Sequence, residues 1–370
     1  MSSRNPRRIA LLALAALLLF VVVLLKLPIA DFIRALEGHD LARAVLSRKR
    51  LVFAIVGLFS IVVAGWLVFR RQFYLQLVKI LANRLRSPGR QGRIFVSMIG
   101  SIGDLIYLFP SLEVLRRRHV IDMGTGGYPY LAVVGNNPHV AHVYAPFIYK
   151  PSRAVQRRLI TRVLAPFYER VLLLDLPDGD WWKDGKHFVE RYAEACGCPP
   201  PHKGILYLSG DNRRAAADYL RQRGLDSFVY VAQMVRHRLP FRTWPLAHYH
   251  ALLRLLHERL ALPIVVDTVG SDEAALPDFC VDAGRLDVLT AAAVIERARL
   301  FVGSDSGLTH VAGALGTPTV AIHLGYPPET CVALGDRVEV VRQRRPFDDP
   351  AATSPEEVLA SVERAFCGGR

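Results

Sequence analysis

"FVGSDSGLTHVAGALGTPTVAIHLG", residues 301–325, is the stretch that decides the fold class of this 370-residue sequence. The run "LFVGSD" at its start is typical of a buried strand, and "GLTHVAGALG" has the spacing of a helix that ends at a glycine before a proline. Asp305 and Ser306 therefore fall at a strand-to-helix turn, where Ser306 is suited to cap the helix and Gly307 permits close backbone approach. His310 follows one helical turn later. Polar groups gathered at such a turn indicate a ligand site, although a cap and one partly buried histidine would give the same pattern.

Strand and helix patterns alternate from residue 93 onward in two series. The first contains the predicted strands "RIFVSMIG", "YLAVVG" and "RVLLLDLP", and the second runs from "SFVYVAQM" to "RVEVVRQ". Alternation of this kind is typical of parallel, doubly wound α/β sheets. Because the two series meet near "CPPPHKG", residues 198–204, we predict two Rossmann-like domains, 93–204 and 205–370, that face a cleft.

Residues 1–92 are predicted to anchor the chain in a membrane. Uncharged apolar runs cover Ile9–Leu25 and Leu51–Phe69, which is long enough for two transmembrane helices spanning about 9–27 and 51–69. A cleaved signal peptide is the alternative for the first run, but no small-x-small cleavage motif follows it. The Lys and Arg residues are distributed too evenly between the loops to give a clear orientation.

A basic segment, "RQFYLQLVKILANRLRS" (residues 71–87), follows the second apolar run. Its apolar residues recur at helical spacing among four cations, Arg71, Lys79, Arg84 and Arg86. Such a helix could lie in the headgroup layer with its cations facing phosphates, or it could continue the membrane helix as a stalk. "SPGRQG", residues 87–92, then predicts a hinge before the first strand.

Charge and cysteine content restrict the partners and the location. The net charge of +14 lies almost entirely in residues 1–93, which hold 16 Lys and Arg against 3 Asp and Glu. A nucleic-acid enzyme would carry its basic surface on the folded domains, so this distribution favours anionic membrane lipids and not nucleic acid. The five cysteines form neither a disulfide framework nor a zinc pattern, which favours a reducing, cytosolic compartment.

Two further strand ends carry polar side chains. In "SMIGSIGDLIYLFP" the glycine spacing fits neither the dinucleotide nor the phosphate-loop motif, so Asp104 either caps a helix or takes part in catalysis. In "VRHRLPFRTWPLAHY" three arginines, Arg236, Arg238 and Arg242, precede a helix that opens at Pro245. Guanidinium groups beside free helix N–H groups suit a diphosphate, although a solvated basic loop would look the same.

Together, these three motifs resemble those of glycosyltransferase family 9, the heptosyltransferase-like enzymes of lipopolysaccharide assembly, over residues 93–345. The resemblance implies a GT-B fold and inverting transfer from a nucleotide-activated sugar such as ADP-heptose, without a metal or a cofactor. It implies that Asp104 is the catalytic base, that Arg242 contacts the diphosphate and that Glu273 holds the ribose of the donor. Arg236 and Arg238 would be further diphosphate contacts. The donor-binding loop would contain Asp305, Ser306, Gly307 and His310.

We therefore expect a membrane-anchored inverting glycosyltransferase that uses a lipid-linked or lipopolysaccharide-type acceptor. Its catalytic part would lie on the cytoplasmic side of a bacterial-type inner membrane. One alternative is a nucleotide-sugar epimerase of the GT-B fold, which would share the donor site. The other is an inactive, membrane-tethered scaffold that binds nucleotide sugars, which would have no need of a base at Asp104.

Overall fold

The computed structural model describes residues 72–73, 75–87, 89–148, 154–175, 180–234, 239–269, 276–284 and 286–367. The chain divides into two compact units, Met1–Arg71 and Gln72–Arg370. The predicted membrane spans, 9–27 and 51–69, lie outside the described residues. Within those residues no helix is long and apolar enough to cross a membrane.

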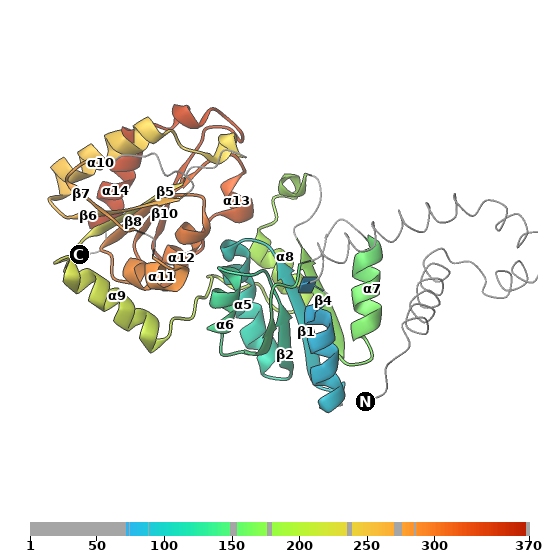
Figure 1. The fold of residues 1–370 in the computed structure, drawn as a ribbon. Coiled ribbons are helices and arrows are strands. Elements are labelled where there is room, and N and C mark those ends of the chain that lie inside the picture. The colour runs from blue at the N-terminus through green and yellow to red at the C-terminus, as the bar shows by residue number, and fades with distance from the viewer. Residues whose placement is uncertain are drawn as a thin grey trace, which may run out of the picture. The chain divides into compact units, whose positions relative to one another are not determined.

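The first half of the unit Gln72–Arg370 is built on a parallel four-stranded sheet with the order β3-β2-β1-β4. Successive side chains of β1 point to opposite faces, so Ile94 and Val96 join one core while Phe95 joins another. Helices α5, α6 and α8 cover the first face and α7 covers the second (Figure 1). The strands are β1 (Arg93–Ile99), β2 (Val120–Gly124), β3 (Val140–Tyr144) and β4 (Arg170–Asp175). The helices are α5 (Ile102–Arg116), α6 (Tyr130–Gly135), α7 (Ala154–Leu164), η1 (Trp181–Asp184) and α8 (Phe188–Cys196).

One predicted strand of this half is wrong. "YLAVVG" forms the helix α6, and the sequence patterns missed two strands, β2, which pairs with β1, and β3, which pairs with β2. A short apolar run fits a buried strand and a buried helix equally well by periodicity. β2 was hidden because its buried face includes the charged residue Asp122.

The helix of residues 75–86 packs on the second face of the same sheet. Ile80 is fully buried there, the Phe73 ring lies 4.9 Å from the Phe147 ring, and the amide of Asn83 donates to the Tyr144 hydroxyl at 3.0 Å. The segment predicted as a hinge after this helix is also held in place. Arg90 Nε donates to the carbonyl of Tyr168 at 3.1 Å, and the Gly92 N–H donates to Glu169 at 2.8 Å. The helix is thus part of the core of this half.

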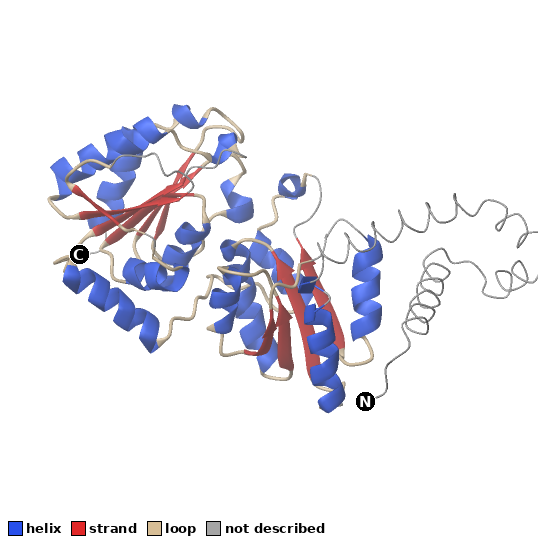
Figure 2. Cartoon of the chain, viewed as in Figure 1, coloured by secondary structure: helices blue, strands red, loops and turns tan. Residues whose placement is uncertain are grey.

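The second half contains a parallel six-stranded sheet with the order β10-β9-β8-β5-β6-β7. Helices lie on both of its faces (Figure 2). Its strands are β5 (Val229–Met234), β6 (Ile264–Val269), β7 (Cys280–Asp282), β8 (Leu300–Ser304), β9 (Thr319–His323) and β10 (Val338–Arg342). Its helices are α9 (Gly210–Gln222), η2 (Pro240–Arg242), α10 (Leu246–Leu260), α11 (Val288–Glu296), α12 (Gly307–Leu315), α13 (Pro328–Cys331), η3 (Pro350–Ala352) and α14 (Pro355–Cys367).

The predicted α/β class with parallel, doubly wound sheets is confirmed. In each sheet the chain first adds strands on one side of a starting strand and then crosses over to add strands on its other side. The starting strand is β1 in the first sheet and β5 in the second. Such points of reversed strand order are where ligands bind in open α/β sheets. Helices α5 and α12, which follow β1 and β8, pack against each other and join the two halves. The carboxyl ends of the strands beside both reversal points therefore meet at one place.

The packing of the helix of residues 75–86 can be tested with paired truncations in the full-length protein. Ile80→Ala should lower the free energy of unfolding by about 2–5 kcal/mol, because it leaves a cavity in a closed core. Val78→Ala is the matched control, because Val78 is 62% exposed on the same helix and its truncation removes no core contact. Urea denaturation followed by tryptophan fluorescence measures both. Equal stability of the two variants would contradict the packing described.

Candidate active site

Asp104 is fixed at the beginning of α5. Its carboxylate accepts a hydrogen bond from the Ser101 N–H at 2.5 Å, and Ser101 Oγ in return accepts from the Asp104 N–H at 3.4 Å, which forms a capping box. The Tyr192 hydroxyl donates to the second carboxylate oxygen at 2.7 Å. The side chain is 5% exposed. The predicted capping role is therefore present, and each oxygen keeps a second lone pair with which it can accept a proton.

The turn between β8 and α12 departs from the prediction in one respect. Ser306 stands at the N-cap position with extended backbone, but its side chain makes no capping hydrogen bond. Its hydroxyl instead lies 3.3 Å from that of Thr309, which donates to the Ser304 carbonyl at 2.5 Å. The first N–H groups of α12 are therefore not capped by Ser306. An uncapped helix start of this kind attracts anions.

Gly307 has a packing role that the sequence did not reveal. A Cβ atom at this position would lie 3.1 Å from the Cβ of Ile102, at the start of α5. Glycine is thus needed here for close approach between α12 and α5, and not only for approach of a ligand. A glycine on α5 also permits the close approach of the two helices, because a Cβ on Gly103 would lie 2.5 Å from the ring of His310 on α12.

Arg242 forms an ion pair with Asp305. Both side chains are largely buried, at 18% and 3% exposed, and the guanidinium also lies 3.4 Å from the Asp305 carbonyl. Burial alone would raise the pKa of Asp305, but the Arg242 charge and the neighbouring His310 ring hold that pKa well below its ordinary value. Arg242 Nε is buried without a hydrogen-bond partner among the described residues. The ring of Tyr326 lies 5.6 Å below the guanidinium.

His310 links this ion pair to the other half of the molecule. Its Nε2 lies 3.6 Å from Asp305, and its Nδ1 lies 2.9 Å from the hydroxyl of Tyr107 on α5. The hydroxyl also lies 2.5 Å from the carbonyl of Val332, to which it can donate. Burial, followed by the charge of Asp305, raises the pKa of Tyr107 well above its ordinary value, so Tyr107 stays protonated. A connected polar chain thus runs from Arg242 through Asp305 and His310 to Tyr107.

The structure brings together most of the predicted site residues. Asp104 and Tyr107 are three residues apart on α5, hence on one helix face, and Tyr107 contacts His310. The other predicted residues, Glu273, Arg236 and Arg238, lie outside the described part of the chain. Tyr107 was missed by the sequence analysis, although its place one turn after Asp104 was a usable signal. Tyr192 and Tyr326 had no comparable signal, because their partners are distant in sequence.

Asp305 of the ion pair and two neighbouring side chains form a group of potential metal ligands. Ligand atoms of Asp305, His323 and Cys331 lie within 4.8 Å of one another, and all three residues are buried. Burial raises the pKa of the Cys331 thiol to about 12 and lowers that of His323. Asp305 is already engaged by Arg242, whose positive charge opposes a second cation at the same carboxylate. The absence of a metal stays a prediction.

The ion pair predicts a distinctive pH dependence of stability. Arg242→Met should cost about 3–5 kcal/mol of unfolding free energy near pH 8, because it leaves a buried carboxylate without its main partner. In the wild type the pKa of Asp305 is depressed, so its contribution persists down to about pH 4 and is lost only in stronger acid. In the variant, burial favours the protonated form of Asp305. The loss of unfolding free energy relative to the wild type should therefore become smaller as the pH falls from about 8 to about 5.

Urea titrations at both pH values measure this effect, and Arg242→Met combined with Asp305→Asn is the control. The double variant removes the unpaired charge and should recover stability near pH 8. A penalty in Arg242→Met that does not change with pH would show that lost packing, and not the uncompensated carboxylate, causes it.

Part of the chain is similar in sequence to known glycosyltransferases. Residues 181–357 match the family model for glycosyltransferase family 9 (heptosyltransferase). A stretch of 117 residues is 31% identical to lipooligosaccharide heptosyltransferase 2 of Haemophilus influenzae, covering 28% of this chain and 33% of that protein. The match thus spans about a third of the length of the curated relative.

Two solved structures share the fold over nearly their whole length. The family 9 glycosyltransferase from Veillonella parvula superposes with a TM-score of 0.58 at 17% identity, covering 76% of this chain and 98% of that one. ADP-heptose lipopolysaccharide heptosyltransferase II of E. coli gives a TM-score of 0.58 at 19% identity, with coverages of 75% and 99%. These likenesses confirm the predicted GT-B-like arrangement. The part of the chain at residues 181–357 is thus similar to glycosyltransferase family 9 (heptosyltransferase), the family that the sequence motifs predicted.

Proposed function

We propose that this chain is an inverting glycosyltransferase that moves a sugar from a nucleotide sugar to a lipid-linked or lipopolysaccharide-type acceptor. One observation carries the proposal. Asp104, from the first half, lies one helical turn from Tyr107, which contacts the Arg242–Asp305–His310 group of the second half. A candidate base and a candidate diphosphate site thus belong to one polar assembly. ADP-heptose is the donor to test first, because the E. coli fold relative is named for it.

The chemistry requires a base and an anion site. In a single displacement, the acceptor hydroxyl oxygen bonds to the anomeric carbon while the bond from that carbon to the diphosphate breaks. Asp104 takes the hydroxyl proton through a carboxylate lone pair that the capping box and Tyr192 leave available. The departing diphosphate gains negative charge, which cations and helix N–H groups stabilise.

Arg242 can serve the diphosphate without breaking its ion pair. A guanidinium has five N–H donors in a fixed fork, and the contacts with Asp305 involve one terminal nitrogen. Nε has no partner among the described residues, so it still has a hydrogen to donate to a phosphate oxygen. The uncapped start of α12 supplies further N–H donors next to Asp305. With these donors the reaction needs no metal ion for the leaving group.

The membrane assignment is part of the proposal. The two apolar runs of residues 1–92 hold the enzyme at a bacterial-type inner membrane, with the nucleotide-sugar site on the cytoplasmic side where nucleotide sugars are made. Reporter fusions after Arg50 and at Arg370 test the topology. A reporter at Arg370 that is active only outside the cytoplasm would overturn this assignment.

The role of Asp104 is tested by Asp104→Asn, which keeps the size of the side chain and an oxygen acceptor for Ser101. The transfer rate should fall by about 10²- to 10⁴-fold, because the amide cannot take the proton, while donor affinity should stay unchanged. Glu113→Gln is the matched control, since it makes the same chemical change on the same helix, at a side chain that does not contact the site residues described above. Its transfer rate should equal that of the wild type.

The assay follows radiolabelled sugar from ADP-heptose into extracted glycolipid, with donor binding measured in parallel. Isomerised free nucleotide sugar in place of labelled glycolipid would identify an epimerase. Donor binding without transfer in both wild type and variant, and unchanged envelope glycolipids in cells carrying Asp104→Asn, would identify a scaffold. Mass spectrometry of envelope glycolipids with and without the gene identifies the sugar and its carrier.

A further inference from the structure

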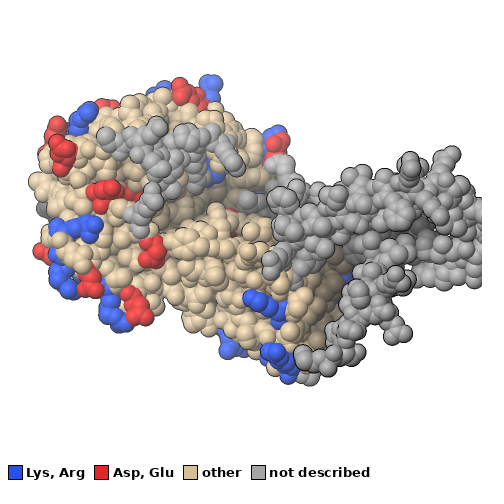
Figure 3. All heavy atoms as spheres, viewed as in Figure 1, with Lys and Arg blue, Asp and Glu red and all other residues tan. Residues whose placement is uncertain are grey.

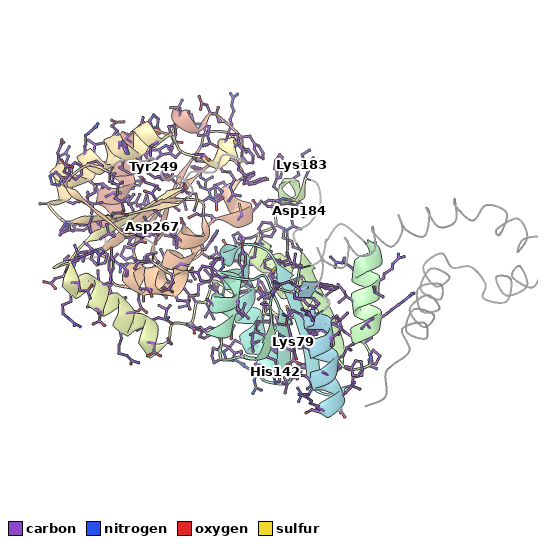
Figure 4. The ribbon with its side chains drawn as sticks, in the orientation of Figure 1. Lys79, His142, Lys183, Asp184, Tyr249 and Asp267 are labelled. Carbon is purple, nitrogen blue, oxygen red and sulfur yellow. The ribbon has the colours of Figure 1, made fainter. Side chains whose placement is uncertain are left out.

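The strongest unassigned feature is a surface pocket of about 660 Å³ between the helix of residues 75–86 and the edge strand β3. The helix contributes polar and basic side chains, β3 contributes residues 141–144, Ala145 follows that strand, and α6 contributes Leu131. Figure 4 labels Lys79 and His142, which lie on the two walls of this pocket. None of the site residues described above lines it.

The charge of the pocket has one sign. Lys79, Arg86 and His142 line it, whereas no Asp or Glu does, and neither the helix, α6 nor β3 contains an acidic residue. In the described part of the chain Lys79 and Arg86 have no salt-bridge partner. The carboxylate beneath the pocket, Asp122, is already engaged by His142 at 2.8 Å and by the Tyr168 hydroxyl at 2.7 Å. Figure 3 shows that most of the charged atoms visible on this half are basic.

Exposed apolar side chains flank the cations on the same helix face. Leu75, Val78 and Leu85 are 47%, 62% and 69% exposed, and their spacing places them on one face with Lys79 and Arg86. Leu131 on the pocket wall is 43% exposed. The opposite helix face is buried, with Ile80 and Arg84 facing the core. Apolar residues beside cations fit the boundary between headgroups and acyl chains, whereas a free phosphate ion would gain nothing from them.

We propose that this pocket binds the phosphate of an anionic phospholipid headgroup, while Leu75, Val78 and Leu85 enter the adjoining acyl region. Lys79 and Arg86 supply the charge, and Asn83 and His142 line the site with further polar groups. The uncharged run Leu51–Phe69, proposed above as a membrane span, ends only six residues before Leu75 in the sequence. The proposal does not depend on sugar transfer, so its test involves no enzymatic readout.

The experiment compares hydrogen exchange of the full-length chain in nanodiscs of phosphatidylcholine alone and of phosphatidylcholine mixed with phosphatidylglycerol. Exchange in peptides covering residues 75–86 and β3 should slow by about 30-fold in the anionic discs, since Lys79 and Arg86 would each contribute an about fivefold preference for an anionic membrane. Lys79→Gln with Arg86→Gln should abolish this difference. Peptides from β8 and α12 should keep their wild-type exchange, which shows that the fold is intact.

Arg254→Gln with Arg259→Gln is the matched control, because it removes two exposed cations from one helix, α10, and leaves the pocket unchanged. It should keep the full effect of phosphatidylglycerol. Glycerol phosphate added to phosphatidylcholine discs distinguishes a lipid from a free phosphate. Equal exchange in both kinds of disc, loss of the effect in the α10 control, or the same protection by glycerol phosphate would each overturn the proposal.

Discussion

The close packing of α5 against α12 is the constraint on which the site depends. Two glycines permit it, since a Cβ on Gly103 would lie 2.5 Å from the His310 ring and one on Gly307 would lie 3.1 Å from Ile102. A third, Gly204 in the connection between the halves, would place a Cβ 2.3 Å from a methyl of Ile106. Without this approach Tyr107 would not reach His310. The helix that carries Asp104 would then have no direct polar link to the Arg242–Asp305–His310 group of the other half.

The electrostatics of the site are balanced before any substrate arrives. Asp305 would be costly to bury alone, but Arg242 neutralises it and the His310 ring lies 3.6 Å from it. Under the proposed function, a diphosphate that enters would meet a nearly neutral pair and not a free cation. The additional attraction would then come from the uncapped N–H groups of α12, the spare Nε of Arg242 and the ring of His310. Such a site would bind the proposed anion by geometry more than by net charge.

The sequence predicted those parts of the site that depend on local chain geometry. The turn from β8 to α12 was predictable, because a buried strand, a helical pattern and a terminating glycine follow within sixteen residues of one another. The ion pair between Arg242 and Asp305 was not, because it joins residues 63 positions apart. The contact of Tyr107 with Val332 spans 225 positions. Local periodicity carries no information about partners that are distant in sequence. It can also assign the wrong secondary structure to a short apolar run, as the prediction of a strand at helix α6 shows.

The helix of residues 75–86 shows a different limit of sequence patterns. Its apolar residues were predicted to form one stripe, facing either lipid or a stalk partner, but the structure divides them between two faces. Phe73, Leu77 and Ile80 pack with the core of the first half, while Leu75, Val78 and Leu85 remain exposed. A helix that is apolar on opposite faces cannot bury both in one small domain. Its outer face, which also carries Lys79 and Arg86, is therefore built for a second, anionic and apolar environment. Because the inner face is fixed in the core, whatever binds the outer face also orients the sheet on which α5, the helix of Asp104, packs.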